Sequence, residues 1–465
     1  MRHGSPIWLL LSSPAPLVLA CLLAAQSHAP AARSQPPAGK ASVETPIIFT
    51  AAPVYDSLAA LRGGERFPQG AQLMIERDGT PMPLVPQLAA SADASVSFDG
   101  KIILFAGKQQ PRDPWQIWSV SADGGEPQRQ VAAETDLIRP LWMPGGRMVY
   151  ARRSPQGFAL ESAALDGSVL QRLSFLPGSF IPDDVMRDGR VLFETGFPLG
   201  SGATPEMFLV YGDGSGVESV RCDHGVGREH GKQMLSGDIV FTHGSKLARF
   251  TSALAEEAAI AAPAGSFAGD VVETQDGRWL LSVRKPGNGH FELAAWQPGA
   301  AQAQTTARDD ERDLVQPVVV APRAVPNRHP SALHDWKTGN LLALNARLTR
   351  SGPLTAPPQS VNVETIGPDG RTVVLGTAPV ESDGSFFVQA RGDEPLRFIL
   401  LDAAGNKIRA EDGWFWVRGG EQRICVGCHT GPERAPDNRV PQILLRSTTP
   451  ADMTGSANTV ATGGH

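Results

Sequence analysis

The sequence is poor in cysteine, tyrosine and charge, and these shortages exclude several classes of protein. Its 465 residues include four cysteines and three tyrosines, and charged residues make up 19%. So few cysteines cannot organise a chain of this length through disulfides. The net charge of -6 does not fit a nucleic-acid binder, which is usually basic. Beyond the N-terminus, no segment approaches the roughly 20 apolar residues of a membrane span.

Turn-forming residues, by contrast, are abundant. The chain has 49 glycines and 39 prolines, and both residue types are unfavourable inside helices. With 41% apolar residues, the chain can bury ordinary cores, and its length suggests more than one domain. The composition therefore predicts a mainly β protein with few long helices.

The N-terminus has the features of an export signal. Arg2 precedes apolar stretches that end near Ala29 in a small-x-small cleavage pattern, so residues 1–29 are interpreted as a signal peptide and 30–44 as a linker. A lipid anchor at Cys21 is the alternative, but the apolar run continues past Cys21, which favours cleavage near Ala29. The expected location is the periplasm.

One sequence pattern recurs along residues 45–320. A turn glycine, a small or charged residue and a short apolar strand follow one another at Gly100, Gly146, Gly189, Gly237 and Gly277, which lie 40 to 48 residues apart. An earlier unit near Ile47 and Met74 fits the same pattern. Repeats of this length built from short strands are typical of propeller blades. The repeated pattern resembles that of the TolB-like propellers. Its five glycine-anchored units and the earlier unit imply six blades.

A different composition follows the repeats. Residues 321–350 are proline-rich and are interpreted as a connector, with a short helix expected at 341–345. Alternating apolar strands between Asp-Gly turns predict a small β-sandwich-like domain over 351–420. Residues 421–446 form the next segment, and the tail 447–465, rich in Thr, Ser, Ala and Gly, is expected to be disordered.

The segment 421–446 contains the motif C-x-x-C-H. Cys425, Cys428 and His429 have the spacing of a covalent c-type haem site, in which two thioethers hold the porphyrin and the histidine binds iron. Neither a second C-x-x-C for zinc nor a thioredoxin-like frame accompanies the motif. The sequence therefore predicts one covalent haem c, with His429 as an iron ligand.

The surroundings of the motif are more distinctive than the motif itself. Residues 412–424 and 435–441 resemble the middle-domain family of the hydrazine synthase alpha subunit, in which a TolB-like propeller precedes a small β domain and a C-x-x-C-H haem site. The family's hydrazine-forming type has a tyrosine shortly after the motif, whereas this chain has Glu433. The hydrazine-forming type also has a further haem domain, whereas this sequence contains one haem motif. These departures argue against hydrazine synthesis itself.

The sequence does not assign the second axial ligand of the haem, and because the family named above lacks a simple bis-histidine arrangement, the resemblance implies an iron that is open or weakly ligated. Histidines in the connector or in loops between blades could face the iron; the candidates are His329, His334, His224 and His230. Alternatively, Cys222, His224, His230 and His243 could bind zinc or copper. The aromatic run Trp414, Phe415, Trp416 could pack on the porphyrin or fill a core, and Arg418, Arg423 and Arg439 are candidates for its propionates.

Two functions follow from these features. The first is an exported monohaem redox protein that transfers electrons to or from a periplasmic partner, or performs redox chemistry on a small molecule at a haem facing the propeller. The second is a binding or scaffold module of a periplasmic complex, in which the propeller holds a protein partner and the haem is a relay or structural cofactor. A haem-dependent oxidoreductase activity is left open.

Overall fold

A computed structural model describes residues 45–196, 204–221, 224–253, 255–331, 333–349, 352–427 and 439–455. Nearly all regular structure in these ranges is β-strand, and the one helix there, α1 (Gln442–Arg446), is short. This part of the chain holds no helix with the length and apolar character for a membrane span. The mainly β fold predicted from the glycine and proline content is confirmed.

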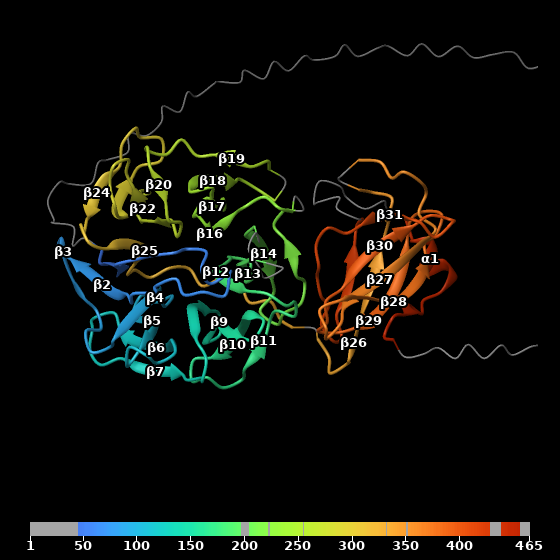
Figure 1. Ribbon diagram of the computed structural model, residues 1–465, viewed down its shortest axis with the longest axis horizontal. Helices are drawn as coiled ribbons and strands as arrows, with labels where there is room; N and C mark the ends of the chain where they lie inside the picture. The colour runs from blue at the N-terminus through green and yellow to red at the C-terminus, as the bar shows by residue number, and fades with distance from the viewer. Residues whose placement is uncertain are drawn as a thin grey trace, which may run out of the picture. The chain divides into compact units, whose positions relative to one another are not determined.

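The first part of the described chain forms six sheets, named blades I to VI (Figure 1). Blade I has the order β25 (Asp313–Val319), β1 (Ile47–Ala52), β2 (Gln72–Arg77), β3 (Thr80–Pro83). Blade II comprises β4 (Ala90–Val96), β5 (Ile102–Lys108), β6 (Gln116–Ser121) and β7 (Gln128–Val131). Blade III comprises β8 (Leu137–Met143), β9 (Arg147–Ser154), β10 (Gly157–Ala164) and β11 (Gln171–Arg172).

The remaining blades repeat this arrangement. Blade IV comprises β12 (Phe180–Val185), β13 (Val191–Thr195), β14 (Glu206–Val210) and β15 (Glu218–Ser219). Blade V comprises β16 (Glu229–Gln233), β17 (Ile239–His243), β18 (Lys246–Phe250) and β19 (Ala258–Ala259). In blade VI, β20 (Ser266–Phe267) and β21 (Val272–Glu273) both pair with β22 (Trp279–Arg284), followed by β23 (Glu292–Trp296) and β24 (Gln304–Ala307).

The ring is closed by joining its two ends in blade I. There β25, the last strand of the ring, pairs antiparallel with β1, the first, so that Thr50 lies opposite Val315. Apolar clusters fill each junction between neighbouring blades; that between blades I and II, for example, contains Ile48 and Phe105, both buried. The junction between blades VI and I is filled in the same way by Leu293 and Phe49. The six-bladed propeller predicted from the repeated glycines is confirmed.

The second part of the chain is a sandwich of two sheets. One sheet has the order β32 (Gln422–Cys425), β26 (Thr338–Ala343), β29 (Phe386–Arg391), β33 (Ala451–Asp452). The other has the order β28 (Thr372–Pro379), β27 (Ser360–Ile366), β30 (Arg397–Leu401), β31 (Lys407–Ala410). Alternate residues of both sheets, such as Val361, Val363, Val388 and Leu400, form one buried core between them.

Two segments differ from the sequence-based expectation. The helix expected at 341–345 is wrong, because residues 338–343 form β26, which pairs antiparallel with β29 and parallel with β32. Residues 451–453 were expected in a disordered tail, but β33 pairs with β29 and Met453 is 2% exposed in the sandwich core. In both cases pairing with strands distant in sequence determines the structure, and local composition carries no signal of it.

Trp416 connects the sandwich to blade IV. Its side chain is 1% exposed and lies edge-on to Phe180, with the ring centroids 6.3 Å apart. Its indole Nε1 donates a hydrogen bond of 2.8 Å to the carbonyl of Gly214. Arg418 and Arg423 donate further hydrogen bonds to the carbonyls of Asp213 and Val217, respectively. Trp416 therefore fills an interface rather than offering a face to a porphyrin.

Replacing Trp416 with alanine should lower the free energy of unfolding by about 3–5 kcal/mol, since a large buried side chain is lost. Guanidinium unfolding followed by circular dichroism measures the change. Trp336→Ala is the matched control, because Trp336 is 60% exposed and its loss should cost less than about 0.5 kcal/mol. Equal losses in the two variants would contradict this account of the interface.

Candidate functional site

Cys425 ends β32 at the edge of the sandwich sheet. It lies opposite Ala343 in a parallel register, and its carbonyl accepts a hydrogen bond of 2.9 Å from the amide of Leu344. The thiol is half-buried and forms no disulfide within the described residues, which contain no other cysteine. Burial raises the pKa of Cys425, and the nearby Arg423 guanidinium opposes this shift. The first thiol of the motif is therefore held by a strand and chemically free.

The residues after Cys425 lie against the loop that follows β26. A Cβ at Gly427 would stand 2.9 Å from both the carbonyl oxygen of Asn345 and the Cβ of Leu348, so only glycine fits there. Val426 lines a small pocket whose other walls come from three segments, namely Leu344, Asn345, Leu348, Asp383, Arg439 and Pro441. Cys428 and His429 lie outside the described residues. The described part of the motif therefore packs closely on the sandwich.

Among the candidate second-side histidines, His224 shares a neighbour with the Cys425 thiol. Its Nδ1 makes a hydrogen bond of 2.8 Å to Glu206 Oε2, and this contact raises the pKa of His224. Its Nε2 would stand 3.1 Å from a Cβ added at Gly413, so the ring lies directly against the sandwich.

The shared neighbour is Glu411, whose carboxyl interacts electrostatically with both His224 and Cys425. Burial raises the pKa of Glu411 to about 7, and the charges of Arg423 and His224 oppose the shift. One imidazole, one carboxyl and one thiol from the propeller and the sandwich therefore influence one another electrostatically.

The connector histidines are engaged elsewhere. His329 stacks on Tyr211 with a centroid distance of 3.9 Å. His334 lies beside the exposed Trp336, with the two rings 5.3 Å apart.

The zinc or copper group predicted from Cys222, His224, His230 and His243 is not assembled among its described members. His224 contacts Glu206, and the exposed His243 contacts Glu257 at 2.6 Å. His230 is instead buried with Asp183 and Glu194. Cys222 lies outside the described residues. Closeness in sequence did not produce closeness in space here, because each histidine occupies a different part of its blade.

Sequence reasoning missed a ring of polar residues at the centre of the propeller. The innermost strand of each blade is interrupted, and a polar residue occupies each interruption; the polar ring consists of Asp93, Arg139, Asp183, His230, Asp270 and Gln316. Five of these residues have a positive φ, between 51° and 60°, and the exception is Asp183. All six are buried. The available signal was a polar residue recurring every 40 to 47 positions inside an otherwise apolar strand.

Strong charge interactions connect residues of the polar ring across the centre of the propeller. Arg139 of blade III contacts Asp270 of the opposite blade VI at 2.9 Å, and this guanidinium lowers the pKa of Asp270 against the effect of burial. Burial raises the pKa of Asp183 to about 7 and lowers that of His230 to about 4. Backbone strain together with buried charge is typical of functional sites rather than of cores.

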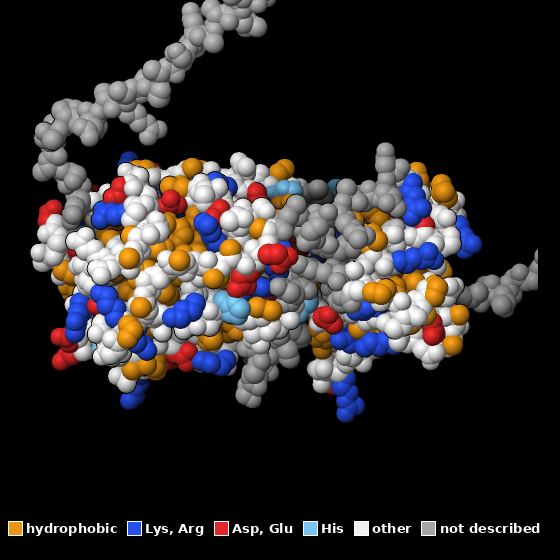
Figure 2. Space-filling view, turned by 90° about the horizontal axis from the view of Figure 1, so that it is seen from above, with side chains coloured by type: hydrophobic (Ala, Val, Ile, Leu, Met, Phe, Trp, Pro, Cys, Tyr) orange, Lys and Arg blue, Asp and Glu red, His pale blue; other side chains and the backbone are white. Residues whose placement is uncertain are grey.

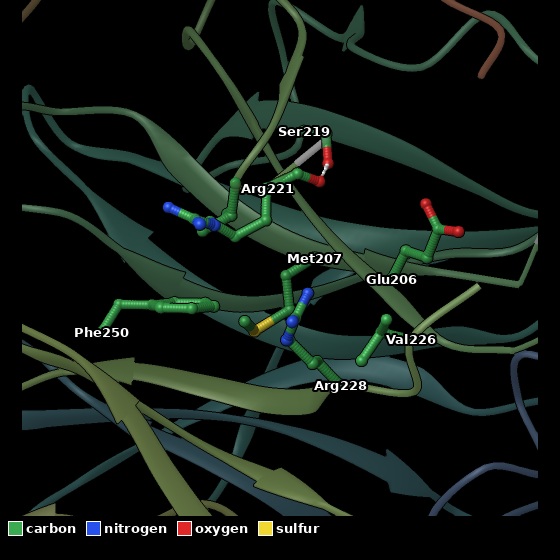
Figure 3. A pocket seen from close by; sticks show the side chains of 8 residues that line it. Glu206, Met207, Ser219, Arg221, Val226, Arg228 and Phe250 are labelled. Carbon is green, nitrogen blue, oxygen red and sulfur yellow. Dashed lines mark hydrogen bonds between the residues drawn. The ribbon is translucent and has the colours of Figure 1, made fainter. Parts of the chain in front are cut away.

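A second small pocket has Val226 among its walls (Figure 3). Its walls include Glu206, Met207 and Phe250 together with two arginines, Arg221 and Arg228. Arg221 contacts Glu256 at 3.2 Å and Arg228 contacts Glu257 at 2.8 Å. Because both guanidinium groups are already paired with carboxylates, the pocket has little capacity for an anionic ligand.

Comparison with known proteins gives the haem motif a context. Residues 349–430 match the family model of the hydrazine synthase alpha subunit middle domain. The hydrazine synthase subunit alpha of Kuenenia stuttgartiensis is 36% identical over 61 residues, which are 13% of this chain. This chain resembles the hydrazine synthase alpha subunit. The resemblance inferred from the residues around the motif is thus confirmed.

The structural likeness is broader than the sequence likeness. A solved structure of Kuenenia stuttgartiensis hydrazine synthase superimposes with a TM-score of 0.75 at 16% identity, covering 87% of this chain and 72% of that one. The sequence match, however, spans only 8% of the curated hydrazine synthase subunit. TolB from Acinetobacter baumannii has a TM-score of 0.45 at 14% identity and covers 60% of this chain and 67% of its own. The fold is therefore shared with hydrazine synthase.

Proposed function

We propose that this chain is an exported monohaem c-type protein that transfers electrons in the periplasm. Cys425 and Cys428 would form the two thioethers and His429 would bind the iron. The observation that carries the proposal is the free Cys425 thiol, held at the end of β32 within the segment that matches the hydrazine synthase alpha middle domain. When bound, the haem supplies a one-electron redox couple whose potential depends on its ligands and surroundings.

His224 is the candidate that we propose for the second side of the iron. Its Nδ1 is hydrogen-bonded to Glu206, and its ring lies against Gly413 of the sandwich, so its imidazole would be the second ligand of the iron. The shared neighbour Glu411 supports its closeness to the motif. His329 is stacked on Tyr211 and His230 is buried in the polar ring, so neither has comparable support. Two histidine ligands favour electron transfer, because no coordination position is left for a substrate.

The surrounding residues would tune the haem rather than react. Arg423 places a positive charge beside the Cys425 thiol, and Glu411 holds a proton near neutral pH. Since burial raises the pKa of Glu411 to about 7, its negative charge develops as the pH rises through that value. A reduction potential that falls with rising pH near neutrality follows from that added charge.

A protein partner belongs to the proposal as well. The relative that this chain resembles is named as a subunit, which favours an assembly with other chains. The face shown in Figure 2 carries basic and acidic side chains interspersed. Such a surface suits a polar, reversible contact with an electron donor or acceptor.

Absorption and electron paramagnetic resonance spectra of the purified protein test the ligand assignment. The wild-type iron should be six-coordinate and low-spin, and His224→Ala should make it high-spin and open to rapid carbon monoxide binding when reduced. His334→Ala is the matched control and should leave the spectra unchanged. If the wild type already binds carbon monoxide rapidly and His224→Ala changes nothing, the electron-transfer assignment is wrong and small-molecule chemistry at the haem takes its place.

A further inference from the structure

Three buried side chains converge where blades IV and V meet the centre of the propeller. Asp183 in β12, Glu194 in β13 and His230 in β16 each offer a donor atom, and these atoms all lie within 4.8 Å of one another. The residues are 0%, 2% and 3% exposed. The group combines an imidazole with two carboxylates and is separate from the haem motif.

The His230 imidazole has no hydrogen bond within the described residues. Neither Nδ1 nor Nε2 has a hydrogen-bond partner there, and the carboxylate oxygen of Glu229 stands 3.5 Å from Nε2. Leaving a buried polar group without a partner costs about 1–3 kcal/mol, so such groups are rare in native proteins. The Tyr55 hydroxyl, which interacts electrostatically with Glu194 and Asp270, is buried and has no hydrogen-bond partner in the described part of the chain either. Two orphaned polar groups around one spot indicate a missing ligand.

The backbone holds this imidazole in a fixed position. His230 has a φ of 56°, and its amide donates a hydrogen bond of 3.1 Å to Glu194 Oε2. The next amide, of Gly231, donates to Asp183 Oδ2 at 3.3 Å. On the other side, a Cβ at Gly269 would stand 2.4 Å from the Cβ of His230, so the ring has no room to turn away. The strained strand orients the donors before any ligand arrives.

The charge around the group is also unbalanced. Negative and positive side chains of this region interact with one another electrostatically; the carboxylates are Asp93, Asp183, Glu194, Glu229 and Asp270, and the cations are Arg66, Arg139 and Lys232. The region therefore holds five carboxyl groups against three cations, and a divalent cation would add positive charge to a group rich in carboxyls.

We propose that Asp183, Glu194 and His230 bind one divalent transition-metal ion of the Zn²⁺ class at the centre of the propeller. The imidazole distinguishes this set from the all-oxygen sites of Ca²⁺ and Mg²⁺. Zn²⁺ takes nitrogen and carboxylate ligands at about 2.0–2.2 Å, so rotation of the side chains must bring the donors somewhat closer than 4.8 Å. Three protein ligands leave a fourth position for water, toward which the Tyr55 hydroxyl is a suitable hydrogen-bond partner. The ion would tie blades IV and V together.

Metal titration of the full-length, haem-loaded, untagged protein tests this site after treatment with a chelator. Calorimetry with Zn²⁺ and with Co²⁺ should each show one ion per chain. His230→Ala and Glu194→Gln should each weaken Zn²⁺ binding at least about 100-fold, because removal of an indirect, outer partner already costs about 10–100-fold. His243→Ala, which removes an exposed histidine, is the matched control and should bind as the wild type does.

Each result of these titrations either supports or overturns the metal-site proposal. Failure of the wild type to bind Zn²⁺ and Co²⁺, or equal binding by the wild type and His230→Ala, overturns the proposal. A loss of binding in His243→Ala alone identifies an adventitious surface site and overturns it too. If His230→Ala does not fold, His230→Gln and the rise in the wild-type melting temperature on adding Zn²⁺ decide the matter; no rise counts against the site. Because the haem spectrum is not the readout, failure here leaves the electron-transfer proposal standing.

Discussion

Replacing Cys425 and Cys428 together with alanine should abolish covalent haem completely, because both porphyrin attachments are lost. The polypeptide itself should still fold, since Cys425 is half-buried at the end of a short edge strand and contributes little to the core. Haem staining after denaturing electrophoresis and the mass of the intact chain measure the attachment. Haem that remains covalently bound to the double variant would contradict the proposed site.

The control for this experiment concerns the compartment. A chain lacking residues 1–29 retains the motif but should remain in the cytoplasm, where haem attachment is not expected to occur. It should therefore have the mass of the unmodified polypeptide. Covalent haem on this cytoplasmic chain would refute the periplasmic assignment while leaving the thioether site intact.

A chain that begins at Ser91 should lose the entire propeller rather than one sixth of it. The deletion removes β1, β2 and β3, so β25 loses the strand with which it pairs and the apolar clusters at two junctions are exposed. Since each blade buries its faces only against its neighbours, we expect insolubility or loss of cooperative unfolding. Circular dichroism melting and size-exclusion chromatography measure the effect.

The control for the ring is a chain that begins at Glu44, which keeps every described strand of the propeller. It should melt cooperatively at the wild-type temperature. If the chain beginning at Ser91 is also monomeric and melts cooperatively, then the blades are independent units and the closed ring does not determine stability.

The blades could be predicted because each one carries its own local signal. Gly100 and Gly277 both stand at positive φ in turns, and an apolar strand follows each. The sandwich was harder to predict, because Leu341 and Leu342 belong to a short apolar run that fits a helix or a strand equally well. Only the partners of β26, which lie far along the chain, decide between the two. Local pattern therefore identified the propeller, and long-range pairing completed the sandwich.

The candidate site was predictable only in part for the same reason. The haem motif was predictable because a sequence displays the spacing of Cys425, Cys428 and His429 directly. The contacts of His224 with Glu206 and Gly413 join different elements, and the grouping of Asp183 with His230 depends on two adjacent blades. No spacing rule links these pairs, because the ring geometry brings them together.

The placement of Met453 has a consequence for the order of events during secretion. Met453 and β33 follow the haem motif in sequence, yet they complete the core of the sandwich that carries it. In an exported chain, which crosses the membrane N-terminus first, both thiols of the motif reach the far side before the last piece of that core does. Under the proposed export and haem attachment, the maturation machinery would meet cysteines on a domain that cannot yet close, and the final strand would complete the domain afterwards.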